Sequence, residues 1–558
     1  MHVMSRVGAA AAAAFIVAAP QAAIAQPADF RVQADAVLAE AYPADGPGVA
    51  VIVTRGGQTV YAAGRGMADI AANRPLAPSS VFRLGSITKQ FTAAVILQLV
   101  GEGRISLDDP LTRFFPDYPQ PGGGATVRQL LRHLSGIQSY TGIPGWMEPN
   151  MNRPHSTAQM IAAFRDLPSP TRPGEAFAYN NSGYLLLGAI IEQVTGKAWH
   201  EAISERISRP LGLTTIAYGE DVAASAAMVR GYGIGDNGPE AAMAIHMSVP
   251  HAAGGLVGSV EDLAKWARAL HHGRVVTPAL YREMITRTPL PDGSESPYGM
   301  GLTNADARGR AGIGHGGNIN GFATDSLYLP AEDMFIAVFA NVENPAVDPP
   351  TLLRRIAALA LGDPYPIFTR AALDMAAVEP LFGVYRISDN EARRFYARDG
   401  KLYTSRDGGR ELEVFPAGGD RYFYGPGSLT WFRIERGADG THVMHMHSNG
   451  QNEAVRSPRT GPIPPEAPTV AVAETLLRTY VGRYLTGGPV VTIAMAEAGG
   501  LTVQLDGQPA LPLRAISERE FRVEEVGARI AFDVADGSVT GLVIHQGGGQ
   551  LPARRDGD

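Results

Sequence analysis

The spacing of hydrophobic and polar residues predicts strands and helices in the first part of the chain. Two β-rich runs, at residues 49–54 and 58–63, flank Arg55-Gly56-Gly57, which is the pattern of a β-hairpin. Residues 86–100 and 182–195 carry apolar side chains at helical spacing, and each run is followed by a glycine. We therefore expect a hairpin followed by a largely helical region.

Strand character returns later in the same part of the chain. Residues 326–329 and 334–341 read as strands, and residues 351–361 read as a helix. Strands at both ends of a helical middle indicate an α+β domain whose antiparallel sheet combines segments that are distant in sequence. We place this domain at residues 27–365.

The rest of the chain consists of short alternating β runs that contain a weak repeat. Phe382-Gly383-Val384-Tyr385 recurs as Val481-Gly482-Arg483-Tyr484. Counted from each tyrosine, four more pairs stand at similar distances, namely Leu402 and Leu501, Phe423 and Phe521, Phe432 and Phe532, and Arg456 and Arg554. The repeat predicts two copies of one small β-barrel module, at 378–458 and 470–558, joined by a proline-rich linker at 459–469.

The first 25 residues have the layout of a secretory signal. One arginine is followed by an apolar run at 7–19, and Ala23-Ile24-Ala25 matches the small-residue rule for cleavage. The run is shorter than the roughly 20 apolar residues that span a bilayer, and no later segment is long enough either. We expect cleavage near Ala25 and a periplasmic or secreted product.

Composition excludes several classes of protein. The chain has no cysteine, so disulfides, cysteine-ligated metals, attached c-type haem and thiol nucleophiles are all excluded. The formal charge of -7 argues against a nucleic-acid partner, because nucleic acid requires a basic face. Lysine occurs only at positions 89, 197, 265 and 401.

Sequence motifs of other hydrolase classes and of metal sites are absent or incomplete. No serine stands in G-x-S-x-G and no Walker A sequence is present. His200-Glu201 begins like a zinc-protease helix, but Ser204 stands where the second histidine belongs. A second candidate for a metal site is the set His442, His445 and His447. Only two of these share a strand face and no third ligand is evident, so we expect neither a metal nor a cofactor.

Ser86 and Lys89 open the first predicted helix. Residues three apart lie on one helix face, so the amine can reach the hydroxyl. A helix start also places backbone N–H groups and the positive end of the helix dipole near a developing oxyanion. Lysine acts as a base only where burial or charge lowers its pKa, and the neighbouring apolar residues Phe82, Ile87 and Phe91 can supply that burial.

Two further motifs follow in order. Tyr179-Asn180-Asn181 precedes the second helix, and His315-Gly316-Gly317 precedes the late strand pair. Together with S-x-x-K, and with phrases such as FRLGSITKQFTA, LLRHLSGI and GHGGNINGF, they resemble the penicillin-recognising serine hydrolases. That group contains class C β-lactamases, D-Ala-D-Ala carboxypeptidases, D-aminopeptidases and related esterases. The resemblance covers about residues 35–360 and implies a β-lactamase/transpeptidase-like fold.

The resemblance also implies roles for the matched residues. Ser86 would be the acylated nucleophile, Lys89 its base, and Tyr179 the group that passes a proton to the leaving group and later activates water. His315 would complete the catalytic set. Expected to bind substrate are Asn181, Gly317, Asn318 and Tyr140, with the N–H groups of Ser86 and Asn318 forming the oxyanion hole. Tyr140, with Trp146 and Tyr298, lines the cleft in this interpretation, and ordinary packing is the alternative.

One departure from the family pattern concerns His315. Class C β-lactamases carry lysine at this position, which offers a permanent cation to a substrate carboxylate. Histidine is largely neutral at pH 7 and is better suited to donating a hydrogen bond. The substitution argues against efficient β-lactamase activity and favours the peptidase and esterase branches.

The two β modules resemble the lipocalin-like barrels of D-aminopeptidases. In those enzymes a long loop from the last barrel selects the free amine of the substrate, and here only ten residues separate Phe521 from Phe532. We therefore predict an exported serine hydrolase of short peptides, including D-residue-containing or linearised cyclic ones. The alternatives are a carboxylesterase or weak β-lactamase of this fold, and a non-catalytic penicillin-binding sensor. The oligomeric state is not predicted.

Overall fold

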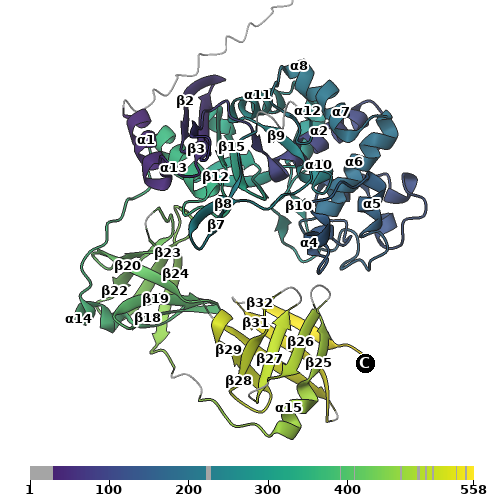
Figure 1. The fold of residues 1–558 in the computed structure, drawn as a ribbon. Coiled ribbons are helices and arrows are strands. Elements are labelled where there is room, and N and C mark those ends of the chain that lie inside the picture. Colours follow the sequence, from purple (N-terminus) through teal and green to yellow (C-terminus); the bar gives the residue numbers. More distant parts are fainter. Residues whose placement is uncertain are drawn as a thin grey trace, which may run out of the picture.

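A computed structural model describes the chain over eleven stretches: 29–221, 228–389, 391–406, 409–425, 427–464, 468–486, 490–496, 499–505, 508–535, 537–546 and 549–557. The predicted signal peptide at 1–25 lies outside these stretches. Within them, no helix is both long and apolar enough to cross a bilayer. Figure 1 shows a mixed α/β unit, coloured purple to teal, followed by two barrels, coloured green to yellow.

The first unit is built on a seven-stranded antiparallel sheet. Its strands are β1 (Val49–Arg55), β2 (Gln58–Arg65), β12 (Thr303–Ala307), β13 (Arg310–Gly314), β14 (Gly317–Ile319), β15 (Phe322–Leu329) and β16 (Met334–Ala340). The order is β12-β13-β15-β16-β1-β2, and β14 also pairs with β15. β1 pairs with β16 from Val49 opposite Ala340, so the predicted sheet of segments distant in sequence is confirmed.

Both faces of the central strands of this sheet are buried. Val49, Val51 and Val53 of β1 pack with α1 (Phe30–Ala41) and α13 (Pro349–Leu361). Ala50 and Ile52 point to the opposite face and join the core of the helical region. Because strand side chains alternate between faces, a strand covered on both sides reads as a continuous apolar run, as VAVIV does here.

The helical region lies on the second face of the sheet. It contains α2 (Thr88–Gly101), α3 (Val127–Leu131), α4 (Met147–Asn150), α5 (Thr157–Ala162), α6 (Asn181–Thr195), α7 (Trp199–Ile203), α8 (Arg209–Leu211), α10 (His251–Gly254), α11 (Val260–His271) and α12 (Pro278–Ile285). Short strands β3 (Met67–Asp69), β4 (Arg74–Pro75), β5 (Phe82–Arg83), β6 (Ala217–Tyr218), β7 (Tyr232–Gly235), β8 (Gly238–Ala241), β9 (Leu256–Gly258), β10 (Thr288–Pro289) and β11 (Glu295–Ser296) connect them. α2 and α6 are almost wholly buried, which explains their apolar sequences.

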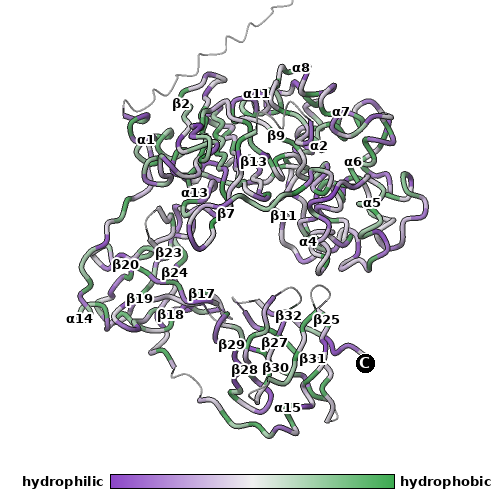
Figure 2. Tube along the Cα trace, viewed as in Figure 1, coloured by the Kyte–Doolittle hydropathy of each residue, from purple (hydrophilic) through white to green (hydrophobic). Residues whose placement is uncertain are grey.

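Two closed eight-stranded barrels follow. Barrel 1 comprises β17 (Gly383–Ser388), β18 (Glu391–Arg398), β19 (Lys401–Arg406), β20 (Leu412–Gly418), β21 (Arg421–Phe423), β22 (Trp431–Arg436), β23 (His442–His447) and β24 (Val455–Gly461). Barrel 2 comprises β25 (Gly482–Leu485), β26 (Val490–Met495), β27 (Leu501–Leu505), β28 (Leu511–Ala515), β29 (Glu520–Val523), β30 (Ala528–Ala535), β31 (Ser538–Gln546) and β32 (Gly549–Arg555). Hydrophobic and hydrophilic residues alternate along their strands (Figure 2).

Short helices precede both barrels, α14 (Met375–Val378) and α15 (Glu474–Tyr480). β24 continues to Gly461, so it takes in the first residues of the stretch assigned to the linker from sequence. The turn from β29 to β30 is short and contains one 3-10 turn, Glu524–Val526. The two-barrel architecture predicted from the repeat is confirmed.

The strand register corrects the details of the repeat. Tyr385 and Tyr484 do match, since each donates its hydroxyl to the carbonyl four residues earlier, and Leu402 matches Leu501. The other three pairs are wrong, because the register pairs Phe521 with Tyr422, Phe532 with Ile434, and Arg555 with Arg459. Identical side chains suggest the wrong pairs because the cores accept different apolar residues at one position.

Candidate active site

Ser86 and Lys89 lie on one continuous helical turn. Ser86 sits in a 3-10 turn, Gly85–Ile87, that runs directly into α2. Lys89 Nζ lies 3.0 Å from Ser86 Oγ, 2.8 Å from Asn181 Oδ1 and 2.9 Å from the Ala253 carbonyl oxygen. The amine therefore connects the start of α2 with the start of α6 and with α10.

Lys89 is wholly buried, with an exposed fraction of 0%. This burial lowers the pKa of its amine well below the ordinary value, because a charged group is disfavoured away from water. The rings of Tyr179 and Tyr184 face Nζ, with their centroids 4.7 Å and 5.5 Å away. None of its three polar contacts is with a carboxylate, so the neutral amine is favoured.

Tyr179 differs from Lys89 in the direction of its pKa shift. Burial of its hydroxyl end raises its pKa above 10, and an interaction with Ser86 offsets this only in part, so the phenol stays protonated at neutral pH. The ring nevertheless exposes 42% of the residue's surface. The site thus holds, beside the same serine hydroxyl, an amine whose pKa is lowered and a phenol whose pKa is raised.

The Tyr-Asn-Asn sequence divides two tasks between its asparagines. Asn180 is the N-cap of α6 and accepts a hydrogen bond from the Gly183 N–H at 2.9 Å. Asn181, the first residue of the helix, presents its side-chain oxygen to Lys89. The capping residue therefore fixes where the helix begins, and with it the position of Asn181.

His133 belongs to the site, although the sequence offered no role for it. It is 1% exposed, and its Nδ1 accepts the backbone N–H of Asn180 at 3.0 Å. Its ring lies 4.3 Å from that of Tyr179 and 4.4 Å from that of Tyr298. Burial and the nearby Lys89 lower its pKa well below 6.5, so it is neutral. In the sequence, only its place in the family-like segment LLRHLSGI points to a role for this histidine.

His315 is neutral, as expected, because burial lowers its pKa to about 3. Its Nδ1 lies 2.6 Å from the Gly316 carbonyl oxygen, which can only accept, so Nδ1 carries the proton. Nε2 then accepts the hydroxyl proton of Tyr298 over 2.8 Å. Both ring nitrogens are engaged within the protein, so in this arrangement His315 does not offer a hydrogen bond to a substrate.

The strand after His315 packs directly against the serine turn. A Cβ on Gly317 would lie 2.2 Å from the Leu84 carbonyl oxygen and 2.9 Å from the Ser86 nitrogen. Gly85 has a φ of 53°, and its own Cβ would lie 3.2 Å from the Asn318 nitrogen. Only glycine permits this approach, which brings the backbone nitrogens of Ser86 and Asn318 to the same place.

Tyr140 does not reach the surface of the site. It is 2% exposed, packs against Trp146 and Phe164, and donates its backbone N–H to Ser182 Oγ at 2.8 Å. The structure assigns it to the core beneath the site, so the expectation that it lines a substrate cleft is not supported. The sequence alone does not show whether an aromatic side chain in a loop is buried in the core or exposed in a cleft.

Asp325 lies on β15 beneath the His-Gly-Gly turn, where a Cβ on Gly316 would be 3.2 Å from its Oδ1. Burial raises the pKa of this carboxyl to about 7. An acid whose pKa is raised by folding destabilises the folded state as pH rises from its unfolded value near 4 to about 7.

We expect Asp325→Asn to remove that pH dependence. Urea unfolding at pH 5 and pH 8 should show that the wild type loses more unfolding free energy than the variant between the two values. The difference should be at most about 4 kcal/mol. Equal losses in the two proteins would contradict the raised pKa.

The histidines of β23 do not gather metal ligands. His445 Nε2 contacts Glu435 at 2.8 Å, and the ring of His447 stacks on Trp431 with centroids 4.2 Å apart. Among the described residues no group of three or more His, Asp or Glu side chains is arranged to hold a metal ion.

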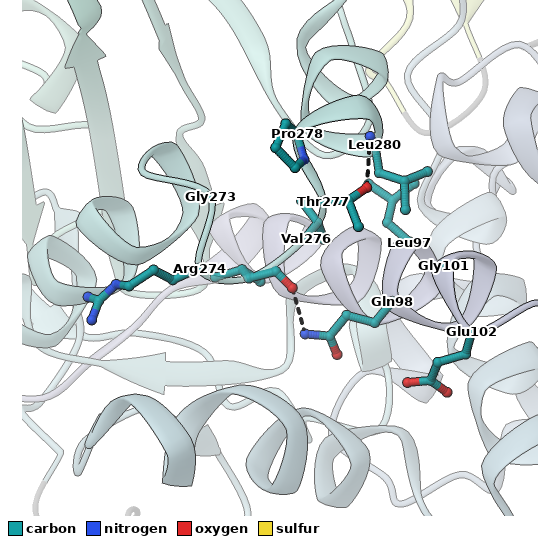
Figure 3. Close-up of a pocket in the computed structure, with 11 residues that line it drawn as sticks. Leu97, Gln98, Gly101, Glu102, Gly273, Arg274, Val276, Thr277, Pro278 and Leu280 are labelled. Atoms are coloured by element: carbon teal, nitrogen blue, oxygen red, sulfur yellow. Dashed lines mark hydrogen bonds between the residues drawn. The ribbon is translucent and has the colours of Figure 1, made fainter. Parts of the chain in front are cut away.

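A surface hollow of about 470 Å³ lies elsewhere on the first unit (Figure 3). It is formed by the C-terminal end of α2 and by residues 273–280, and Gln98 closes one side by donating to the Val275 carbonyl at 3.0 Å. α2 rises about 1.5 Å per residue, so the hollow is on the order of 20 Å from Ser86. It is separate from the serine site.

Comparison with known proteins agrees with this geometry. The family model described as Beta-lactamase matches residues 37–361, which is more than half of the chain. The chain therefore belongs to the beta-lactamase family, a family of serine hydrolases. The resemblance drawn from the three motifs is confirmed.

Two individual proteins are similar to this chain over much of its length. Penicillin-binding protein 4* of Bacillus subtilis (strain 168) is 26% identical over 437 residues, which are 73% of this chain and 94% of that protein. D-aminopeptidase of Brucella anthropi is 29% identical over 339 residues, which are 59% of this chain and 62% of that enzyme. The match thus spans less than two thirds of the D-aminopeptidase.

Solved structures with the same fold include two informative ones. The octameric penicillin-binding protein homologue from Pyrococcus abyssi has a TM-score of 0.55 and 25% identity, covering 77% of this chain and 99% of that one. D-amino acid amidase from Ochrobactrum anthropi SV3, complexed with D-phenylalanine, has a TM-score of 0.51 and 26% identity, covering 56% and 92%.

Proposed function

We propose that this protein is an exported serine hydrolase that cleaves amide bonds of short peptides or amino acid amides, including those with D-residues, through an acyl-enzyme on Ser86. One observation carries the proposal: the amine of Lys89, neutral and buried, stands 3.0 Å from the hydroxyl of Ser86. Export rests on the signal pattern of residues 1–25.

The arrangement suits acylation. A neutral amine has two N–H groups and one lone pair. If the N–H groups donate to Asn181 Oδ1 and to the Ala253 carbonyl, the lone pair is left for the Ser86 proton. Ser86 Oγ then attacks the substrate carbonyl carbon while its proton moves to Lys89 Nζ.

Tyr179 suits the second half of the reaction. Because its pKa is raised, it holds a proton that it can pass to the leaving amine, and the proton that Lys89 took from Ser86 can then replace it on Tyr179. In deacylation the same groups run in reverse, with water in place of the amine. The N–H groups of Ser86 and Asn318 would stabilise the tetrahedral oxyanion.

The electrostatics of the site favour uncharged substrate ends. Neither Lys89 nor His315 offers a permanent cation, so a substrate carboxylate gains little here. An amide or ester needs no such cation. The lack of a fixed cation therefore favours an aminopeptidase or amidase activity over a carboxypeptidase activity. Carboxylesterase and weak β-lactamase activities stay as alternatives, because they use the same acyl-enzyme.

The test combines labelling with a substrate panel. A fluorophosphonate should add once to the purified protein, and peptide mass spectrometry should map the adduct to Ser86. D-phenylalanine amide, D-residue dipeptides, a nitrophenyl ester and nitrocefin should then be compared for turnover. Fastest turnover of the D-amides supports the proposal, whereas no adduct and no turnover would overturn it. Acylation by penicillin without release would indicate the non-catalytic sensor instead.

Gly317→Ala tests the oxyanion hole. The new methyl would collide with the Leu84 carbonyl and push β14 from the serine turn. Loss of one oxyanion donor costs about 10²–10³-fold in kcat. Steady-state kinetics on the best substrate should show this loss in kcat. Gly461→Ala, at the end of β24 where a Cβ meets no atom within 4 Å, should leave kcat unchanged.

A further inference from the structure

A polar cluster lies inside barrel 1, away from the serine site. Arg393 of β18 is 8% exposed, and its Nη1 donates to the hydroxyl of Tyr424 at 2.7 Å. That hydroxyl lies 2.9 Å from Thr404 Oγ1 on β19, and Thr404 is 0% exposed. Arg393 follows the same alternation as Phe395, whose side chain is in the barrel core.

Barrel 2 shows what the same fold does without this cluster. Tyr385 pairs with Arg393 in barrel 1, and its counterpart Tyr484 pairs with Val491 in barrel 2. Continuing the register around the barrels matches Thr404 with Val503 and Tyr424 with Val523. The three valines are 0%, 6% and 2% exposed and belong to the core of barrel 2. The fold of the module therefore does not require polar residues at these positions.

A buried guanidinium is costly unless an anion balances it. Glu391 is nearby on the same strand, but its carboxylate forms an ion pair with Arg406 at 3.1 Å. In the stretches that the structure describes, no carboxylate oxygen lies within 4.0 Å of an Arg393 nitrogen. The hydroxyl partners of Arg393 are neutral. Its charge is thus left without a counter-charge from the described part of the chain.

We propose that Arg393, Thr404 and Tyr424 form a binding site for the carboxylate of a small molecule inside barrel 1. The planar guanidinium matches a carboxylate in shape, and the Thr404 and Tyr424 hydroxyls supply further donors. A monoanion would balance the one charge of Arg393, which has no counter-charge among the described residues. A phosphate carries about 1.5–2 negative charges and would need a second free cation, which Arg406 does not provide because Glu391 occupies it.

The first experiment measures acetate binding to the full-length protein. Calorimetric titration at constant ionic strength, with chloride as the balancing ion, should give a saturable isotherm for the wild type. Arg393→Met removes the charge while keeping the length of the side chain, and it should weaken acetate binding at least about tenfold. The matched control is Arg394→Met, since Arg394 is the next residue and exposed on the outer side of the strand.

Further arms keep the result decisive. Thr404→Val introduces the residue that barrel 2 carries, so folding should be preserved, and with Tyr424→Phe it should also weaken acetate binding. This double variant decides the matter if Arg393→Met does not fold. Equal acetate affinity in wild type and variants would overturn the proposal. Binding of inorganic phosphate without acetate would overturn the carboxylate assignment.

Discussion

Ser86→Ala should lower hydrolysis of every substrate by at least about 10⁴-fold, because it removes the hydroxyl that we propose to be acylated. Lys89, which is hydrogen-bonded to the hydroxyl, and Tyr179 beside it remain in place in the variant. Substrate binding should therefore persist. Steady-state kinetics should show a loss in kcat rather than a rise in KM.

The control for this prediction is Ser538→Ala on an exposed strand end of barrel 2, which should keep full activity. Fluorophosphonate labelling should disappear in Ser86→Ala and persist in the control. Labelling of another serine together with undiminished turnover in Ser86→Ala would show that the nucleophile lies elsewhere.

Lys89→Met should lower kcat by about 10³-fold, since it removes the base while preserving a long apolar stem in the buried space. The wild type should also show a pH dependence that the variant lacks. A base works only when deprotonated, so activity falls as pH drops through the pKa of Lys89. That pKa is held well below the ordinary lysine value of 10.5.

Lys265→Met is the matched control, because Lys265 is 56% exposed and paired with Asp262 at 2.8 Å. It should retain wild-type kinetics. If Lys89→Met kept its activity and its pH profile, the proton would have to leave Ser86 by another route, with Tyr179 the remaining group in contact.

The central residues of the site could be predicted because their roles depend on side-chain functional groups, which the sequence identifies directly. Ser86, Lys89, Tyr179 and Asn181 come together as their motifs indicate. The Ala253 carbonyl could not be predicted, since a backbone acceptor has no residue signature. The role of His133 depends on a backbone bond and on stacking across distant segments, which a single sequence does not display.

The fold shows a similar division. The hairpin and the helix after Ser86 follow from local periodicity, and β1 and α2 lie where it indicates. The repeat predicts two barrels although three of its residue pairs are out of register, because Ile434 fills in barrel 1 the place that Phe532 fills in barrel 2. Register is set by backbone hydrogen bonds, whereas cores exchange residues of similar apolar character.

The scarcity of lysine makes the base directly observable by spectroscopy. Lys197, Lys265 and Lys401 each have an acidic partner and side chains 46%, 56% and 54% exposed, whereas Lys89 is buried. Protein labelled with isotope only in lysine would give four side-chain signals in nuclear magnetic resonance. The signal that titrates apart from the other three would belong to Lys89, so its protonation could be followed without any substrate.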